Sequence, residues 1–157
     1  MIVETEAYTG KDDPGSHASI GLRNRNAPMF ESPGRAYVYQ CHMYPLLNVV
    51  TERNGKPGAV LLRALIPIRG LHTMRRRRPA AHRDVDLCRG PGRLTAAMSV
   101  SLAHNRADLV RGKLRLALPR HPLKFRIART TRIGLHGPAA KLPWRYAVTD
   151  CPLVSGG

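Results

Sequence analysis

The chain has 157 residues, which suits one domain with its own hydrophobic core, and we expect that domain to span residues 1–157. No run of about 18 apolar residues is present, and no charged stretch precedes an apolar one at the N-terminus, so the sequence predicts neither a membrane span nor a signal peptide. Cys41, Cys88 and Cys151 are widely spaced and form no C-x-x-C pair. This spacing argues against a disulfide framework and against a zinc site.

Positive charge is strong and unevenly placed. The chain carries 26 Lys and Arg against 10 Asp and Glu, a net charge of +16. Residues 1–70 hold 8 basic and 6 acidic side chains, whereas residues 71–157 hold 18 and 4. Because Lys and Arg release condensed counterions when they meet phosphates, this distribution favours a nucleic-acid partner. A ribosome-associated or merely soluble basic surface is the alternative that charge alone leaves open.

The first eight residues predict a strand. They read MIVETEAY, in which apolar and polar or aromatic side chains alternate. This period of two places Glu4, Glu6 and Tyr8 on one face. Two carboxylates beside an aromatic ring are unusual in so basic a chain, and they suggest activation of water next to a flat ring. Residues 9–33 are rich in Gly, Pro, Asn and Asp and predict a long loop.

The middle of the chain predicts paired strands. Residues 35–50 contain two strand-like runs around a short interruption. Turn residues at 53–58 then lead into an apolar strand over 59–65 that contains one charge, Arg63. We therefore expect a hairpin on either side of this turn.

The second half mixes helices and strands. Residues 70–78 predict a helix that carries four consecutive arginines and stops at Pro79, and residues 94–102, after a glycine turn at 88–94, have helical spacing. Further strands are expected at residues 114–118, 125–127 and 144–148. Because no βαβ rhythm is visible, the sequence predicts an α+β domain with a mostly antiparallel curved sheet flanked by short helices.

Several residues that can carry chemistry follow one another in a specific order. Glu6 and Tyr8 share a strand face, and His17 follows in the loop nine residues after the tyrosine. Asn48 lies near the end of one strand, and Arg63 lies inside the next. A Cys-x-Gly-Pro motif at 88–91 and a Pro-Trp-Arg-Tyr motif at 143–146 complete the series. In this order the motifs resemble the alkyladenine (3-methyladenine) DNA glycosylase family over nearly the whole chain, from residue 2 to about residue 155.

The resemblance implies hydrolysis of the N-glycosidic bond of a damaged purine that has been flipped out of duplex DNA. Glu6 would be the general base that orients and deprotonates the attacking water. Arg63 would hold the same water, together with a backbone carbonyl near Ile133. Arg63 is also a charge in an apolar strand, so it needs a partner, and Glu6 is the expected one.

The same resemblance implies a base-binding pocket. Tyr8 and His17 would stack on the flipped base, with Tyr39 on the opposite wall, and Asn48 would form the floor that discriminates purines by their exocyclic substituents. Alkylated bases such as 3-methyladenine carry positive charge, and tyrosine faces attract cations by about 0.5–2 kcal/mol each. A nearby carboxylate also stabilises the oxocarbenium-like transition state in which the bond breaks.

The sequence departs from the family at two places. Family members normally carry a further helix and strand ahead of the motif that begins here at Ile2, so we expect the Glu6 strand to have an unpaired edge. Within residues 39–44 the family normally shows a tyrosine followed by glycine, in a stretch one residue longer. That tyrosine fills the gap left by the flipped nucleotide. His42 stands in its place here, which predicts weaker intercalation and weaker flipping from undistorted DNA.

The sequence therefore predicts a monomeric glycosylase that acts on double-stranded DNA with damaged purines and initiates base excision repair without a metal or other cofactor. Arg75, Arg76, Arg77 and Arg78 are expected to face the DNA backbone. No lysine lies near Glu6 to form a Schiff base, so we expect no lyase activity. The protein would work at the nucleoid in a bacterial cytoplasm, or in a eukaryotic nucleus. The alternative is a non-catalytic lesion- or nucleic-acid-binding homologue, inactive because it lacks the N-terminal segment.

Overall fold

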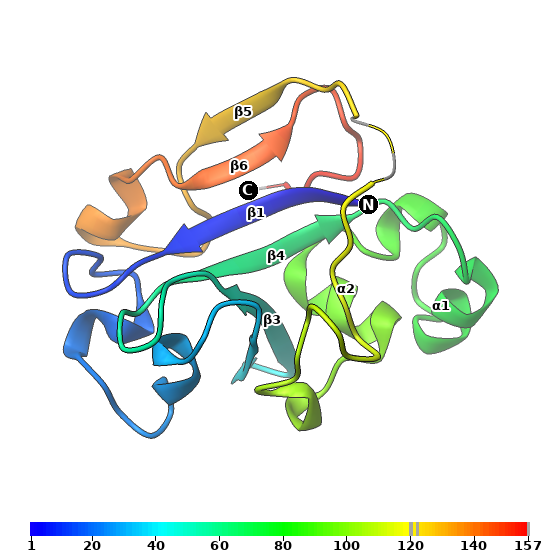
Figure 1. The fold of residues 1–157 in the computed structure, drawn as a ribbon. Helices are drawn as coiled ribbons and strands as arrows, with labels where there is room; N and C mark the ends of the chain where they lie inside the picture. The colour runs from blue at the N-terminus through cyan, green and yellow to red at the C-terminus, as the bar shows by residue number, and fades with distance from the viewer. Residues whose placement is uncertain (120, 122, 157) are drawn as a thin grey trace.

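The computed structural model describes residues 1–119, 121 and 123–156. Within those residues six strands form one antiparallel sheet in the order β2-β3-β4-β1-β6-β5 (Figure 1). The strands are β1 (Ile2–Tyr8), β2 (Ala36–Cys41), β3 (Tyr44–Val50), β4 (Ala59–Leu65), β5 (Ile127–Thr130) and β6 (Arg145–Val148). The predicted α+β class with an antiparallel sheet is confirmed.

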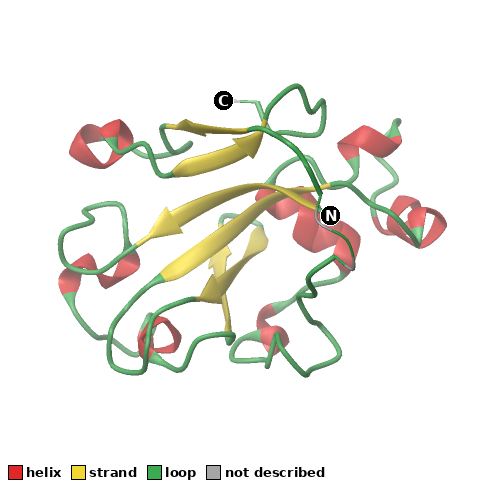
Figure 2. Cartoon of the chain, turned by 45° about the horizontal axis from the view of Figure 1, so that its top comes forward, coloured by secondary structure: helices red, strands yellow, loops and turns green. Residues whose placement is uncertain are grey.

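The helices are short and lie around the sheet, and loops make up much of the remaining chain (Figure 2). The α-helices of the described residues are α1 (Leu71–Arg77) and α2 (Pro91–Met98). Shorter 3-10 helices cover His17–Ile20, Ala27–Phe30, Asp84–Asp86, Leu102–His104 and Gly137–Lys141. None of the helices in the described part of the chain is long and apolar enough to cross a membrane.

The strand that carries Glu6 lies in the middle of the sheet. β1 pairs with β4 along one side, where Glu6 faces Leu61, and with β6 along the other, where Glu6 faces Arg145. The expectation of an unpaired edge beside this strand is therefore wrong. The reason is topological, because β6 returns from the C-terminal part of the chain to lie against β1 (Figure 1).

The other strand predictions for the first half are confirmed. β2 and β3 are joined by a two-residue turn at His42 and Met43, since Cys41 pairs with Tyr44. β3 also pairs antiparallel with β4, which gives the expected hairpin across the turn at 53–58. The predicted bounds of β4 match the structure.

Two predictions in the second half are wrong. The helix expected at 94–102 is α2, which begins at Pro91 because proline is favoured in the first turn of a helix. It ends at Met98 because Ser99 takes a left-handed conformation, with φ 57°. Residues 114–118, all of them described, lie in no strand. The expected strand at 125–127 begins at Ile127, whereas the last strand and the helix at 70–78 are confirmed to within about a residue.

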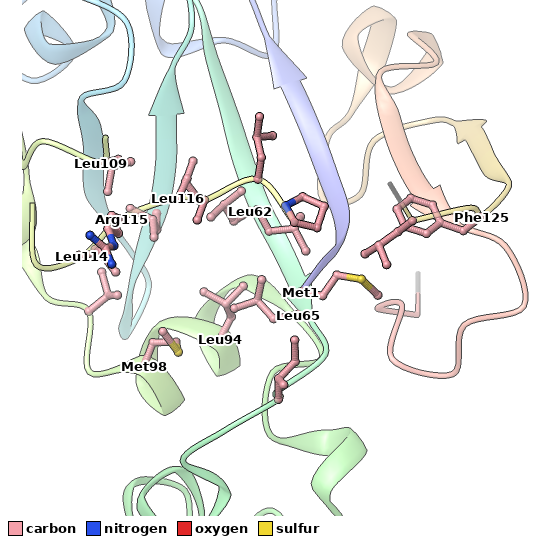
Figure 3. A pocket seen from close by; sticks show the side chains of 18 residues that line it. Met1, Leu62, Leu65, Leu94, Met98, Leu109, Leu114, Arg115, Leu116 and Phe125 are labelled. Atoms are coloured by element: carbon pink, nitrogen blue, oxygen red, sulfur yellow. The ribbon is translucent and has the colours of Figure 1, made fainter. Parts of the chain in front are cut away.

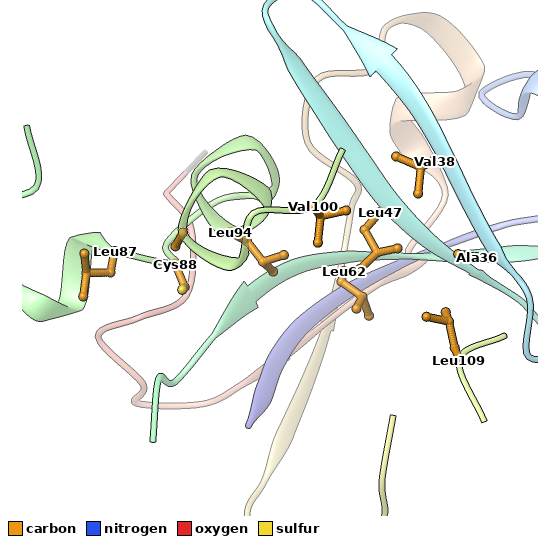
Figure 4. Packing of buried hydrophobic residues seen from close by; sticks show 10 residues of the cluster. Ala36, Val38, Leu47, Leu62, Leu87, Cys88, Leu94, Val100 and Leu109 are labelled. Carbon is orange, nitrogen blue, oxygen red and sulfur yellow. The ribbon is translucent and has the colours of Figure 1, made fainter. Parts of the chain in front are cut away.

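The core lies between the sheet and α2. Val38, Leu47 and Leu62 come from three adjacent strands and are each at most 4% exposed. Leu94 of α2 and Leu109 of a later loop belong to the same cluster (Figure 4). These residues occupy the sheet face opposite to that of Glu6, because Leu62 neighbours Leu61, the residue paired with Glu6.

An apolar cavity of about 590 Å³ adjoins this core (Figure 3). Met1 and Leu65 line it from the sheet and Met98 lines it from α2. Leu116 and Phe125, which lie between Leu109 and β5 in the sequence, also line it. Residues 114–118 all line this cavity and pair with no strand, so the alternation of leucines there does not mark a strand.

Replacing Leu94 tests this placement of the core. We expect Leu94→Ala to lower the free energy of unfolding by about 2–5 kcal/mol, because a fully buried leucine leaves a cavity that the surroundings fill only partly. Urea denaturation measures the change. Leu118→Ala is the matched control, since Leu118 is 94% exposed and its loss is expected to cost less than about 0.5 kcal/mol. Equal losses in the two variants would contradict this placement of the core.

Candidate active site

Two of the candidate residues, Glu6 and Asn48, lie in one row of paired residues that crosses the sheet. Tyr37 of β2 pairs with Asn48 of β3, and Asn48 pairs with Leu61 of β4. Glu6 of β1 faces Leu61 on one side and Arg145 of β6 on the other. Directly paired residues project from the same face of a sheet. One face of five strands therefore carries the site, and the opposite face carries the core.

Glu6 is completely buried and is held by three donors from the described residues. The Tyr8 hydroxyl donates to Oε2 at 2.8 Å, and Arg63 Nη1 donates to the same oxygen at 3.2 Å. The backbone amide of Ile133 donates to Oε1 at 2.7 Å. A carboxylate accepts about four hydrogen bonds, so these contacts leave room for about one more donor.

Two of these contacts refine the sequence prediction. Ile133 was expected to present its carbonyl to the water, and the contact seen is from its amide to Glu6. Arg63 was expected to pair with Glu6, and it pairs with both Glu6 and Glu4, donating Nε to Glu4 Oε1 at 3.0 Å. Arg63 is thus a bridge between two buried carboxylates.

Glu4 is the functional neighbour that sequence reasoning missed. Its Oε1 also accepts from Arg145 Nε and from the Ser155 hydroxyl, both at 2.7 Å, and its Oε2 accepts from the Ser155 amide at 2.7 Å. Burial would raise the pKa of Glu4, but the hydrogen bonds from Ser155 and Arg145 and the charge of Arg63 hold it below its usual value. Glu4 therefore holds the Arg63 guanidinium in the position from which it donates to Glu6.

The four predicted base-binding residues lie around one small cavity. It is lined by Tyr8, Gly15, His17, Met29, Tyr37, Tyr39 and Asn48. Sequence reasoning missed Tyr37, although its position two residues before Tyr39 on the same strand places both rings on one face. The cavity admits the centre of a water molecule over only about 20 Å³, room for about one water. A purine therefore enters only after the lining side chains move apart.

Three of the aromatic rings are in contact. His17 and Tyr39 have ring centroids 4.5 Å apart at 67°, and Tyr37 and Tyr39 have centroids 5.3 Å apart. His17 Nδ1 and the Tyr37 hydroxyl are hydrogen-bonded at 2.7 Å. Tyr39, expected on the wall opposite His17, touches the His17 ring in this closed cavity, and the assignment of the two rings to opposite walls stays a prediction. Asn48 is fixed beside them by donating Nδ2 to the Tyr37 carbonyl at 3.0 Å.

The walls of this cavity are uncharged at neutral pH. Burial, together with the nearby charge of Arg25, lowers the pKa of His17 below its usual value, so the imidazole is neutral. Burial raises the pKa of Tyr37 and of Tyr39 to about 12, so both phenols keep their protons. Burial also raises the pKa of Tyr8, helped by the adjacent carboxylate.

His42 lies at the tip of the β2–β3 hairpin. It takes a left-handed backbone conformation, with φ 50°, and its carbonyl accepts from Gln40 Nε2 at 2.9 Å. Its neighbour Met43 is 83% exposed. The tip therefore presents an exposed apolar side chain beside the histidine that the sequence singled out.

The arginine run of α1 is largely engaged within the protein. Arg75 donates to both carboxylate oxygens of Asp84, at 2.8 and 2.6 Å, while Arg77 and Arg78 donate to backbone carbonyls of neighbouring segments. In addition, α1 follows the end of β4 that pairs with the start of β1, so it lies at the end of the sheet away from Tyr8 (Figure 1). The expectation that the four arginines face the DNA backbone stays a prediction, and three of them also contact the fold.

Comparison with known proteins gives the same family that the sequence motifs resemble. A sequence model of the family described as Methylpurine-DNA glycosylase (MPG) matches residues 1–152. Relatives that carry the name "Putative 3-methyladenine DNA glycosylase" match nearly the whole chain. The relative from Chlorobium phaeobacteroides is 44% identical over 158 residues, which cover 99% of this chain and 77% of the relative.

Two further relatives come from distant organisms. The protein of Methanocella arvoryzae is 44% identical over 98% of this chain and 78% of its own length, and that of Rubrobacter xylanophilus is 46% identical over 94% and 76%. The fold, the site and these matches define the class of protein: it is a DNA glycosylase. The chain belongs to the methylpurine-DNA glycosylase family.

The pH dependence of stability tests the role of Glu4. Because its folded-state pKa is lowered, Glu4 contributes stability that is present above its unfolded value and is lost as the pH falls toward the folded value. We expect the free energy of unfolding to decrease on acidification below about pH 4.5 in the wild type, and to decrease less in Glu4→Gln.

Glu4→Gln also removes one member of a buried charge cluster, so we expect a loss of about 3–5 kcal/mol at pH 7. Urea denaturation from pH 7 to pH 3 measures both effects. Parallel pH curves for the two proteins would contradict the assignment.

Proposed function

We propose that this protein excises damaged purines from DNA by hydrolysing the N-glycosidic bond. One observation carries the proposal. The ring of Tyr8 lines the aromatic cavity, while its hydroxyl donates to Glu6 at 2.8 Å. A base held in the cavity is therefore next to the buried carboxylate, and a water on Glu6 is near the sugar carbon of that base.

Glu6 acts as the general base. A water that donates to its remaining acceptor position gives up a proton to the carboxylate as its oxygen bonds to C1′ of the sugar. The bond between C1′ and the base nitrogen breaks, and the base leaves with the bonding electron pair. Arg63 and the Ile133 amide keep the carboxylate oriented, at 3.2 and 2.7 Å. The negative charge of Glu6 also stabilises the oxocarbenium-like transition state.

The uncharged aromatic walls supply selectivity. Neutral tyrosine and histidine faces stack on any purine, and they attract alkylated bases such as 3-methyladenine and 7-methylguanine by about 0.5–2 kcal/mol per contact because these carry positive charge. Hypoxanthine and ethenoadenine gain from weakened pairing instead, since a poorly paired base costs less to flip. Undamaged purines have neither advantage.

DNA binding and base flipping complete the reaction. The excess of basic residues attracts the DNA backbone. The hairpin tip with His42 and Met43 enters the gap left by the flipped nucleotide, as apolar wedges do in other DNA-binding proteins. The product is an abasic site, the first intermediate of base excision repair. We expect a monomer that works where the genome lies, at a bacterial nucleoid or in a eukaryotic nucleus.

Replacing Glu6 tests the chemistry. We expect Glu6→Gln to release hypoxanthine from a duplex about 10²–10⁴ times more slowly than the wild type, because the amide cannot accept the proton of water. Single-turnover release from an oligonucleotide with one hypoxanthine measures this. Glu52→Gln is the control, since the side chain of Glu52 is 42% exposed and pairs only with Lys56 at the surface.

Three outcomes would contradict the proposal. Unchanged release by Glu6→Gln would exclude the carboxylate as general base. Binding of the lesion without any release by the wild type would favour the alternative, a non-catalytic lesion-binding protein with the same cavity. A covalent adduct trapped with borohydride would indicate a Schiff base and lyase chemistry.

The hairpin tip is tested by His42→Tyr. A phenol ring stacks over a larger area than an imidazole, so we expect release from duplex DNA to rise about fivefold, the effect of about 1 kcal/mol of added stacking. Release from single strands should stay nearly constant, because no neighbouring stack has to be separated. Equal effects on the two substrates would argue against a wedge at this position.

A further inference from the structure

A second buried ion pair contacts two residues that line the aromatic cavity, Tyr8 and Gly15. Arg132 and Asp13 are 119 positions apart in the chain, and both side chains are fully buried. They meet as a fork, with Arg132 Nη1 2.7 Å from Asp13 Oδ2 and Nη2 2.6 Å from Oδ1. Burial would lower the pKa of Arg132, but Asp13 raises it, so the pair stays charged. Neither residue lines the cavity as the structure describes it.

Asp13 organises the loop that leads to His17. Its carboxylate accepts from the amides of Thr9 at 3.1 Å and of Gly15 at 3.0 Å. Its backbone carbonyl accepts from the Ser16 amide at 2.9 Å. The position of the first residues of this loop, and hence of the histidine that follows, therefore depends on where the Asp13 carboxylate is held.

Arg132 in turn contacts β1, through Tyr8 and Ala7, and the residue that precedes β6, Trp144. Its guanidinium carbon lies 4.6 Å from the ring centre of Tyr8 and 5.1 Å from that of Trp144, and its Nη1 donates to the Ala7 carbonyl at 2.9 Å. The next residue along the chain, Ile133, donates its amide to Glu6. One side chain thus contacts the stacking ring and adjoins the residue that orients the carboxylate.

Gly15 provides an independent sign that this arrangement is built closely. A Cβ atom placed there would lie 2.9 Å from Arg132 Nη2 and 2.7 Å from Leu135 Cδ1. Gly15 also lines the cavity. Only a residue without a side chain lets the loop approach the guanidinium at this distance.

Stability alone does not account for the pair. Desolvating two charges costs about as much as their attraction returns, and apolar residues of similar size often hold a fold equally well. Arg132 Nε, moreover, is buried with no hydrogen-bond partner among the described residues. A planar fork nevertheless fixes directions in a way that apolar packing does not.

We propose that Arg132, held by Asp13, is a positioning residue that sets the ring of Tyr8, the loop before His17 and the amide of Ile133 in one arrangement. This inference rests on the proposed function. Arg132 acts on the base and on the water through these neighbours and touches neither. Loss of the fork is therefore expected to misplace the cavity wall and the carboxylate together, without changing attraction to undamaged DNA.

The test compares Arg132→Lys with the charge-free double variant Asp13→Leu/Arg132→Met. Both are expected to release hypoxanthine about a hundredfold more slowly in single turnover, the effect of displacing a reacting group by about 1 Å. Affinity for undamaged duplex should stay within about twofold, because the phosphate contacts are unchanged. The double variant leaves no unpaired charge, so thermal unfolding measures the stability lost where the Thr9 and Gly15 amides no longer have the Asp13 carboxylate as acceptor.

Arg106→Lys is the matched control and should react at the wild-type rate. Arg106 also forms a long-range ion pair, with Glu31 at 2.6 Å, but its side chain is 56% exposed. A folded double variant that reacts at the wild-type rate would overturn the proposal and make the pair structural. If the double variant does not fold, Arg132→Lys decides, and a wild-type rate in that variant has the same meaning.

A spectroscopic readout separates this inference from the proposed function. In the free protein, we expect Arg132→Lys to shift the NMR signals of the Tyr8 ring and of the His17 imidazole, whether or not the wild type releases a base. Unchanged signals would overturn the positioning role. Absence of release by the wild type would defeat the proposed function and leave this measurement to stand by itself.

Discussion

The structure of the site depends on one guanidinium placed between two buried carboxylates. Arg63 donates to Glu4 and Glu6 from the middle of the sheet, and all three side chains are at most 8% exposed. Such a cluster is stable only if every polar atom finds a partner. The partners of Glu4 come from β6, through Arg145, and from the end of the described chain, through Ser155. Segments far apart in sequence must therefore meet before the Glu6 carboxylate is fixed.

Period-two alternation explains how much of the site the sequence could predict. Alternation placed Glu6 and Tyr8 on one strand face, the family resemblance singled out Asn48 and Arg63, and antiparallel pairing brings Glu6 and Asn48 to one face of the sheet. Alternation gives the face of a residue but not its neighbours in other strands. The roles of Glu4 and Arg132 therefore escaped prediction, because each depends on contacts more than 100 residues away.

Local sequence patterns were also insufficient wherever contacts with distant parts of the chain decide the structure. The leucines of 114–118 alternate as a strand would, yet they face an apolar cavity. The arginine run of α1 has the charge of a phosphate-binding surface, yet Arg75 is paired with Asp84. Sequence shows that a charge is present and cannot show whether an internal acid or a phosphate neutralises it. The central position of β1 was likewise invisible, because it depends on the return of β6.

The proposed function requires the protein to bind both DNA phosphates and an alkylated, positively charged base, and the distribution of charge within the protein separates the two tasks. A net charge of +16 attracts phosphates but repels a cationic purine. Inside the fold, two arginines balance the two carboxylates of the Glu4 cluster, and Asp13 balances Arg132. His17 is neutral because burial lowers its pKa. The cavity is therefore locally uncharged within a strongly basic molecule, so aromatic stacking can select the base while distant surface charge holds the DNA.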